Sequence, residues 1–288
     1  MAIVGDSVKS FLCIIFFTAL SVVVVGLGCA GSASDDAGLQ ATTLKLQQAI
    51  QRELDTMDRD LSSAAGRLSQ TGLSRAEAEQ ILDELCHNRS YVVDCCTVDS
   101  AGKMVTVAPA AYRQYEGSDI SQQEHVVKLH RTKQAVLSQV FTAVEGLDAV
   151  DLEWPIMSGT NDLIGSASML IKLEALFDAI IKLEMKDSGV EVWAMQLDGL
   201  IVYDFDTTEI GRNLFQDPLY QPYSQLLSLG SKIITQDSGA GSYEFLSAGM
   251  GQPVKKQAYW ASMGLHGTSW RIVSVRVIAS SALFSRLA

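Results

Sequence analysis

Two histidines and an arginine near the middle of the chain are well suited to binding chemistry. They are His125, His130 and Arg131. A guanidinium holds a carboxylate through two parallel hydrogen bonds, so Arg131 predicts a carboxylate ligand. The alternative is a solvated loop charge. Because the two histidines do not share a helix face at their spacing, the pair predicts no zinc site.

A second set of polar residues lies in the C-terminal half. Tyr203, Asp204 and Asp206 alternate on a strand that runs into a loop. The alternation predicts that Tyr203 faces inward and that the carboxylates hold the loop by accepting backbone N–H bonds. Binding of a cationic ligand by these carboxylates is the alternative. Three aromatic residues are candidates for the same pocket or for core packing: Tyr220, Tyr223 and Tyr243.

The cysteines suggest a disulfide rather than a metal site. Outside the N-terminal segment the chain has Cys86, Cys95 and Cys96. In an oxidising compartment Cys86 could pair with Cys95 or Cys96. Neighbours on a strand point to opposite faces, so only one of the two can face the helix that carries Cys86. Three reduced thiols are the alternative, and neither a metal nor a cofactor is expected.

Catalytic and nucleic-acid-binding functions are disfavoured. The chain has no Gly-x-Ser-x-Gly, His-Glu-x-x-His, phosphate-loop or dinucleotide motif, and residues 238–242 resemble a hairpin turn. The formal net charge of −11 would repel a phosphate backbone. We therefore expect no enzymatic activity and no nucleic-acid partner.

The N-terminus predicts a membrane attachment. An apolar stretch over residues 11–28 follows Lys9 and ends at Cys29, in a sequence similar to a lipoprotein signal. Residues 1–29 are thus expected to be a signal segment lipidated at Cys29 or, alternatively, an uncleaved anchor helix. Either places the remaining chain outside the cytoplasmic membrane. Residues 30–38 are small and polar and predict a linker.

The periodicity of the chain predicts an α+β fold. Apolar residues at three- and four-residue steps predict one long stalk helix over residues 39–72. Two runs, VDCCTVDSAGKMVTV and EVWAMQLDGLIVY, each predict a strand pair, later followed by a helical insertion and three strands. The predicted strands are 91–98, 104–108, 136–142, 150–157 and 163–172, then 189–195, 200–205, 241–246, 254–263 and 270–278.

The chain resembles the double Cache family of extracytoplasmic ligand-binding domains. The resemblance rests on LDGLIVYDFDTTEIGRNLF and GTSWRIVSVRV in the second half and on VDSAGKMVTV, LEWPIM and LIGSASMLI in the first. It covers about residues 39–280 and implies two tandem PAS-like modules, each a roughly five-stranded antiparallel sheet with a helical insertion. The first module would be 73–187, distal to the membrane, and the second 188–280, proximal to it.

The resemblance also implies where a ligand would bind. In this family the ligand lies between the concave face of the sheet and the helical insertion. The implied pocket walls of the first module are Tyr112, His125, His130, Arg131, Ser138 and Trp154. The Arg-x-Trp-Tyr stretch of amino-acid-sensing relatives is replaced here by SQQEHVVKLHRTKQ, so an α-amino acid is not expected. We expect specificity in the first module and scaffold in the second.

Together these features predict a membrane-attached sensor domain that binds a small molecule. Because the chain ends at Ala288, soon after the last strand, it is expected to act through a separate membrane partner. The long helix is a candidate for docking to that partner or for homodimerisation. The alternatives are an interaction module without a working pocket and, third, a hydrolase. Asn88-Arg89-Ser90 is a glycosylation sequon.

Overall fold

The computed structural model describes residues 30–87, 89–185, 189–246 and 252–278. The predictions for the signal segment, for lipidation at Cys29 and for the sequon at Asn88 lie outside these residues. Among the described helices, none combines the length and the apolar character needed to cross a membrane.

The described chain contains five α-helices, two short 3-10 helices and eleven strands. In order they are α1 (Ala30–Thr71), α2 (Ala76–Cys86), β1 (Val92–Asp99), β2 (Met104–Ala108), η1 (Ala110–Tyr115), α3 (Glu124–Thr132), β3 (Val136–Leu137), β4 (Phe141–Thr142), β5 (Asp148–Met157), β6 (Leu163–Ile171), α4 (Leu173–Glu184), β7 (Glu191–Gln196), β8 (Ile201–Asp204), η2 (Thr207–Glu209), α5 (Ser224–Thr235), β9 (Ser238–Phe245), β10 (Val254–Leu265) and β11 (Thr268–Val277).

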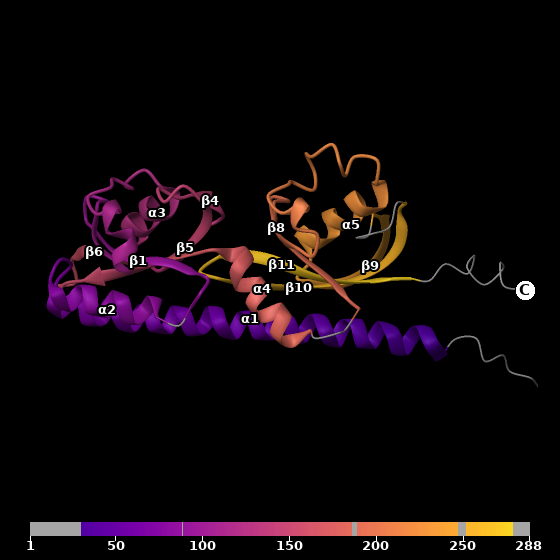
Figure 1. Cartoon of the computed structure of the whole chain (residues 1–288), viewed down its shortest axis with the longest axis horizontal. Helices are drawn as coiled ribbons and strands as arrows, with labels where there is room; N and C mark the ends of the chain where they lie inside the picture. Colours follow the sequence, from indigo (N-terminus) through magenta and orange to yellow (C-terminus); the bar gives the residue numbers. More distant parts are fainter. Residues whose placement is uncertain (1–29, 88, 186–188, 247–251, 279–288) are drawn as a thin grey trace, which may run out of the picture.

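Helix α1 runs the length of the molecule beneath both sheets (Figure 1). Its apolar stripe is fully buried, as at Leu46, Leu54 and Leu61. The helix ends at Thr71, where Gly72 adopts φ +90° and donates its N–H to the Leu68 carbonyl at 2.8 Å. Its start at Ala30 includes the segment predicted to be a linker. That segment has no proline, and its two glycines weaken a helix without stopping one that propagates from the neighbouring residues.

The two sheets share one topology, which confirms the repeated order of elements. Their strand orders are β2-β1-β6-β5-β3 and β8-β7-β11-β10-β9, and β4 adds a sixth strand to the first sheet by pairing with β5. The single strand predicted over 136–142 is instead split. The Ser138 N–H still bonds in register to the Asp151 carbonyl of β5 at 2.9 Å. The Val140 N–H instead bonds to Gln196 Oε1 of the second sheet at 2.7 Å, which interrupts the ladder between β3 and β4.

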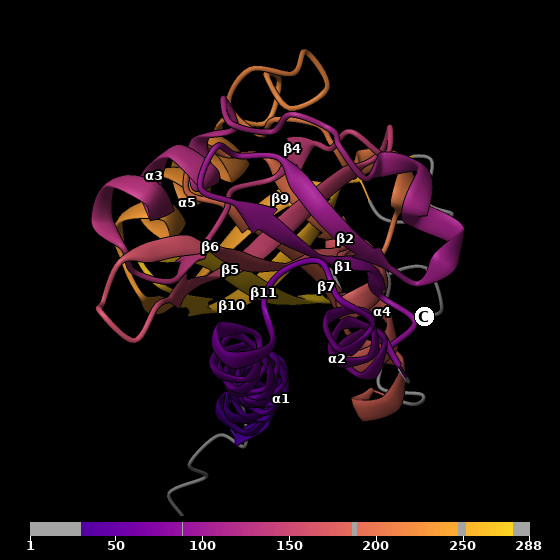
Figure 2. The ribbon, with the colours of Figure 1, turned by 90° about the vertical axis from the view of Figure 1, so that its left-hand side faces the viewer.

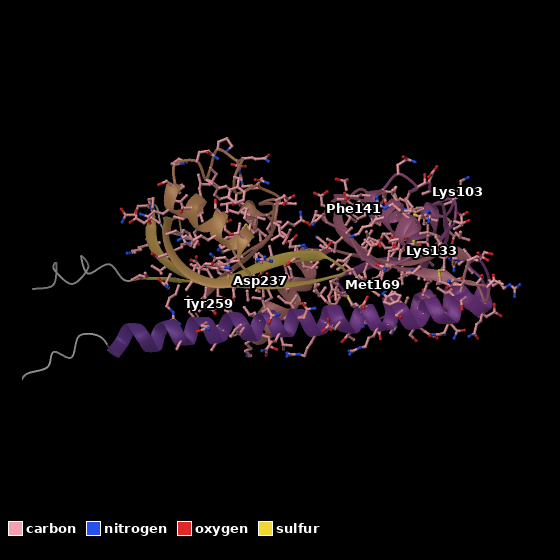
Figure 3. The ribbon with its side chains drawn as sticks, turned by 180° about the vertical axis from the view of Figure 1, so that it is seen from behind. Lys103, Lys133, Phe141, Met169, Asp237 and Tyr259 are labelled. Carbon is pink, nitrogen blue, oxygen red and sulfur yellow. The ribbon has the colours of Figure 1, made fainter. Side chains whose placement is uncertain are left out.

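The two faces of each sheet are covered differently. Viewed end on, α1 and α2 lie below the sheets, while α3 and α5 lie on the opposite side (Figure 2). Below the sheets, one apolar core combines the buried stripe of α1 with residues of both sheets. Met169 and Tyr259 lie on this side (Figure 3), where Gln40 Nε2 donates to the Tyr259 hydroxyl at 2.8 Å. The modules are therefore joined along α1, which leaves the other face of each sheet for a pocket.

Residues 238–242 form the start of β9 and not the predicted hairpin turn. A side chain at Gly239 would clash with the Trp260 ring, and one at Gly241 would clash with Leu229 of α5. The glycines that look like a turn in the sequence thus allow an edge strand to pass close to bulky neighbours.

Cys86, Cys95 and Cys96 form no disulfide in the structure, and the pairing of Cys86 with Cys95 or Cys96 stays a prediction. Cys95 lies on the side of the sheet covered by α2, and its thiol pKa is raised by burial and by a hydrogen bond with Cys86. Cys96 lies on the opposite, pocket side.

Candidate functional site

Strands β5 and β6 place four polar side chains on the face of the first sheet beneath α3. Asp151 and Glu153 are two residues apart on β5, as are Ser166 and Ser168 on β6, so each pair shares a face. The antiparallel register sets Glu153 opposite Ser168. All four therefore project together from what is otherwise a buried apolar surface.

The two carboxylates of this group are buried and only half satisfied. Asp151 is 4% exposed and Glu153 is 0% exposed. The Ser168 hydroxyl donates to Asp151 Oδ2, and the Ser166 hydroxyl donates to Glu153 Oε1, both at 2.5 Å. The other oxygens, Asp151 Oδ1 and Glu153 Oε2, have no hydrogen-bond partner. Unpartnered buried carboxylate oxygens are costly, so these two need a particular explanation.

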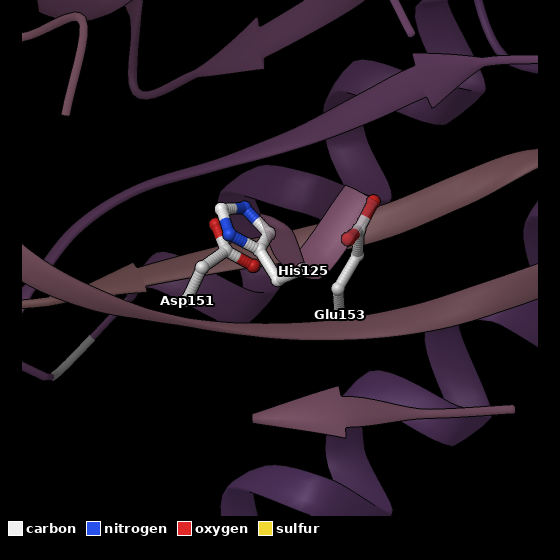
Figure 4. A group of neighbouring side chains, drawn as sticks. All are labelled: His125, Asp151 and Glu153. Carbon is white, nitrogen blue, oxygen red and sulfur yellow. The ribbon is translucent and has the colours of Figure 1, made fainter. Parts of the chain in front are cut away.

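Helix α3 brings an imidazole onto the carboxylates. His125 is 5% exposed, and its ring lies 4.7 Å from that of Phe141 on β4. One donor atom each of His125, Asp151 and Glu153 lies within 4.8 Å of the others. Figure 4 shows both acidic side chains rising from β5 toward the helix. Burial lowers the pKa of His125 to about 4, so its ring is neutral and can act as a ligand at neutral pH.

Two more acids extend the cluster. Burial, and then the charge of Glu145, raise the pKa of Asp94 to about 8. Burial raises the pKa of Glu153 to about 7, and burial followed by the charge of Glu153 raises that of Asp151. Within the described part of the chain, no lysine or arginine forms an ion pair with any of these four acids, which are Asp94, Glu145, Asp151 and Glu153. The cluster is thus an uncompensated group of acids.

Two cavities border the cluster. An inner cavity of about 20 Å³ is lined by Asp94, Glu145, Asp151 and Ser168, among others. An outer groove of about 410 Å³ runs past His125 between α3, the strip 136–142 and Thr268 of the second module. The inner cavity has room for a single water molecule or ion, and the groove brings solvent up to His125.

The strip 136–142 joins this site to the second module. Gln196 on β7 accepts the Val140 N–H, and the Thr268 hydroxyl on β11 donates to the Leu137 carbonyl at 2.5 Å. Phe141, which touches His125, lies in the same strip. One end of the candidate site is therefore fixed to the neighbouring sheet.

The predicted pocket residues of the first module fall into two groups. His125 lies in the site, and Ser138 borders it, its hydroxyl accepting the Asp151 N–H at 2.8 Å. Tyr112 lies apart, in η1, where its ring stacks on that of Tyr115 and packs against a separate apolar cluster. His130 is half-buried further along α3 and is not part of the cluster of donors.

Trp154 and Arg131 do not line the pocket. Because side chains alternate along β5, Trp154 points to the opposite face from Glu153, and its indole N–H donates to Asp58 of α1 at 2.6 Å. Arg131 is exposed at the end of α3. Arg131 therefore offers no grip on a carboxylate ligand in this pocket. Lys128 lines the outer groove, whereas the inner side carries the carboxylates of Asp94, Glu145 and Asp151.

Sequence reasoning missed the two central acids, although a signal was present. In VDLEW the acids alternate with apolar residues, and in GSASM the serines do the same. Two polar positions with a period of two, in strands otherwise expected to be buried, indicate a polar patch on one face. What the sequence lacked was the pairing of β5 with β6, which brings the two patterns together.

The second module has a matching pocket of about 30 Å³ between its sheet and α5, lined by Glu191, Asp204, Glu209, Tyr220, Tyr243 and Lys256, among others. Here Lys256 Nζ lies 2.7 Å from Glu191 Oε2, and the Tyr220 hydroxyl donates to Glu209 at 2.9 Å. Burial, and then the charge of Glu209, raise the pKa of Asp204 to about 8. This pocket carries its own cation.

The carboxylates hold the loop that follows β8 as predicted, but Tyr203 does not face the pocket. Asp204 accepts the Asp206 N–H at 2.8 Å, and Asp206 accepts the Thr208 N–H at 3.1 Å. Tyr203 points away from the pocket and packs edge-on against Phe177 of α4 at 5.9 Å. The strand alternates as expected, with the acid and not the tyrosine facing the pocket.

Comparison with known proteins relates both the sequence and the fold to sensor domains. Residues 52–173 match the family described as HK/GC/Chemotaxis protein-like, sensor domain. An extracellular ligand-binding receptor from Desulfohalobium retbaense shares 34% identity with a TM-score of 0.70. The match covers 83% of this chain but only 40% of the receptor, so the chain spans less than half of that relative's length.

More distant structures have the same fold over nearly their whole length. The extracellular domain of the histidine kinase rpHK1S-Z16 is 14% identical, with a TM-score of 0.66, and the match covers 88% of this chain and 98% of that domain. The ligand-binding domain of the Pseudomonas fluorescens chemoreceptor CtaA, in complex with L-alanine, is 14% identical, with a TM-score of 0.61 and coverages of 86% and 99%. A search of curated proteins found no match.

Proposed function

We propose that this chain, a sensor domain of the Cache type, binds a small cationic ligand in its first module. The observation that carries the proposal is the pair of buried carboxylates, Asp151 and Glu153, each with one unpartnered oxygen. Buried acids of this kind are satisfied by a cation or by protons. In the second module Lys256 supplies the cation, whereas the first module leaves that place to a ligand.

The architecture around the acids supports a sensory role. The site lies between the sheet and α3, bordered by a groove through which a ligand can enter. The strip that carries Phe141 is hydrogen-bonded to Gln196 and Thr268 of the second module. A ligand that moves His125 or Phe141 would therefore act on contacts between the modules.

We further propose that the chain works outside the cytoplasm and passes its signal to a separate membrane partner without catalysing a reaction. Its relatives are described as extracellular receptors and sensor domains, which supports this setting. Helix α1 is the candidate docking element, since it contacts both modules. Crosslinking through cysteines introduced on exposed positions of α1, with and without ligand, would test whether a partner or a second copy docks there.

The ligand-binding proposal is tested by thermal unfolding of the full chain with monoamines, diamines, amidines and metal chlorides. A cation at 100 times its dissociation constant would add about 2.7 kcal/mol of stability. The double variant Asp151→Asn/Glu153→Gln should lose the response, whereas Glu77→Gln, an exposed acid on α2, should keep it. A chain that responds to no cation of any class would instead act as an interaction module without a working pocket.

A further inference from the structure

We propose that the cation bound in the first module is a divalent transition-metal ion, coordinated by His125, Asp151 and Glu153. This inference rests on the proposed function and specifies the ligand class at the same site. It goes beyond the sequence, which predicted no metal because the two histidines of α3 are wrongly spaced. In the folded chain, two carboxylates of β5 lie beside His125, where the sequence offered only a second histidine.

The donor set fits such an ion in chemistry and geometry. One imidazole and two carboxylates form a mixed nitrogen and oxygen set of the kind that zinc and its first-row neighbours accept, whereas magnesium and calcium prefer oxygen alone. Around an ion with bonds of about 2.0–2.2 Å, adjacent donors lie about 3–3.5 Å apart. The three donor atoms already lie within 4.8 Å of one another, so small side-chain rotations would complete the site.

The charge balance favours a divalent ion. Two carboxylates and a neutral imidazole carry two negative charges, which one divalent ion cancels without a further partner. Both carboxyl groups are more than nine-tenths buried, and each has one oxygen without a hydrogen bond. An ion bound to those oxygens would remove the cost that the structure otherwise leaves in place.

The surroundings resemble the outer shell of a metal site. Ser168 and Ser166 each hold one oxygen of a carboxylate and so fix the orientation of the other. The Phe141 ring packs against His125 and limits the rotation of the imidazole. These contacts hold the donors in place before a ligand arrives, which reduces the entropic cost of binding.

Tight packing around the donors favours an ion over an organic amine, since His125, Asp151 and Glu153 are each at most 5% exposed. A cavity of about 20 Å³ is lined by Asp151 but by neither His125 nor Glu153, so it can hold a water molecule beside the three donors. A single ion needs only small side-chain rotations of the donors, whereas an amino acid or a diamine would need the sheet and α3 to separate. The larger groove lies outside His125 and can supply water to the remaining coordination positions.

The experiment is isothermal titration of the full chain, stripped with chelator, with zinc, manganese and magnesium chlorides. We expect one zinc site, binding at least about 100-fold tighter than magnesium. His125→Ala, Asp151→Asn and Glu153→Gln should each weaken zinc binding at least about tenfold. The matched control is His130→Ala on the same helix, which should bind as the parent chain does. Circular dichroism would check that each variant is folded.

X-ray absorption of the zinc-loaded chain provides a readout that does not depend on variants. The expected first shell contains nitrogen and oxygen at about 2.0–2.1 Å. A shell with sulfur from Cys96, or equal zinc binding by parent and variants, would overturn the assignment. If amines bind and zinc does not, the metal assignment fails while the proposed cation-binding function stands. If no cation binds, both fail.

Discussion

The pockets of the two modules occupy the same place in matching sheets, but their buried acids have different partners. In the second module, Glu191 lies against Lys256, and Glu209 accepts a hydrogen bond from Tyr220. In the first, Asp151 and Glu153 are held only by serine hydroxyls, and one oxygen of each is unpartnered. One fold can thus build either a self-contained polar core or a site that requires a ligand, according to whether a strand supplies a lysine.

Removing the internal cation should produce the largest effect. Lys256→Met leaves the neighbouring acids without their buried positive charge, and breaking such a pair costs about 3 kcal/mol of unfolding free energy. The Lys256 and Glu191 side chains are only 6% and 24% exposed, so solvent screens the pair little. Urea denaturation would measure the loss. The exposed neighbour Lys255→Met is the control, and equal stability of the two variants would contradict a stabilising role for the buried Lys256 charge.

Removing charge from the first pocket should stabilise the metal-free chain, whereas removing Lys256 destabilises it. In the metal-free chain at about pH 8, Asp151→Asn/Glu153→Gln should raise the unfolding free energy by about 1–2 kcal/mol, because the amides need neither ionisation nor a cation. The same substitution should abolish stabilisation by zinc. A loss of stability in the metal-free chain would mean that the acids are already compensated, which would contradict the difference between the pockets.

How far the sequence predicts this molecule depends on the range of the interactions involved. The long helix, the repeated order of strands and the loop held by Asp204 and Asp206 follow from local periodicity and turn chemistry, and the structure contains them. The orientations of Trp154 and Tyr203 do not follow, because alternation gives two faces without saying which one is covered by α1 or α4. The helix that packs on the strand determines which face is covered, and that helix is distant in sequence.

The candidate site shows the same limit more sharply. His125 was identified from residue type, but its true neighbours come from β5, and Asp151 lies far along the chain from α3. Glycine-rich residues 238–242 were misread because the reason for those glycines is the bulk of Trp260 and Leu229. In both cases a contact between segments distant in sequence determines the structure, and residue type alone does not reveal that contact.

The pH dependence of stability gives a smaller, cleaner test of the uncompensated acids. The pKa values of Glu153 and Asp94 are raised to about 7 and about 8 in the folded chain. Their protonated forms favour folding, so this stability is present at low pH and is lost as the pH rises toward those values. His125, whose pKa is lowered to about 4, acts in the opposite direction below its ordinary value of 6.5.

The informative window is therefore about pH 6.5 to 8, where the opposing contribution of His125 fades as its unfolded form loses its proton. Urea denaturation of the metal-free chain should show the unfolding free energy falling across it. Asp204 in the second pocket titrates in the same range, since its pKa is about 8. The slope should hence flatten, without vanishing, in Asp151→Asn/Glu153→Gln. An unchanged slope in this variant would assign the whole effect to other groups.

The smallest expected effect concerns the contact through which the first pocket meets the second sheet. Gln196→Ala removes the acceptor of the Val140 N–H, and such a loss costs about 0.5–1 kcal/mol. Amide hydrogen exchange should accelerate at Val140 and its neighbours in the strip 136–142, while β6 stays protected. In the parent chain, zinc should slow exchange in this strip because Phe141 packs on His125. If the strip is indifferent to zinc in both proteins, occupancy of the first pocket is not felt by the second module, and the two pockets are independent as well as different.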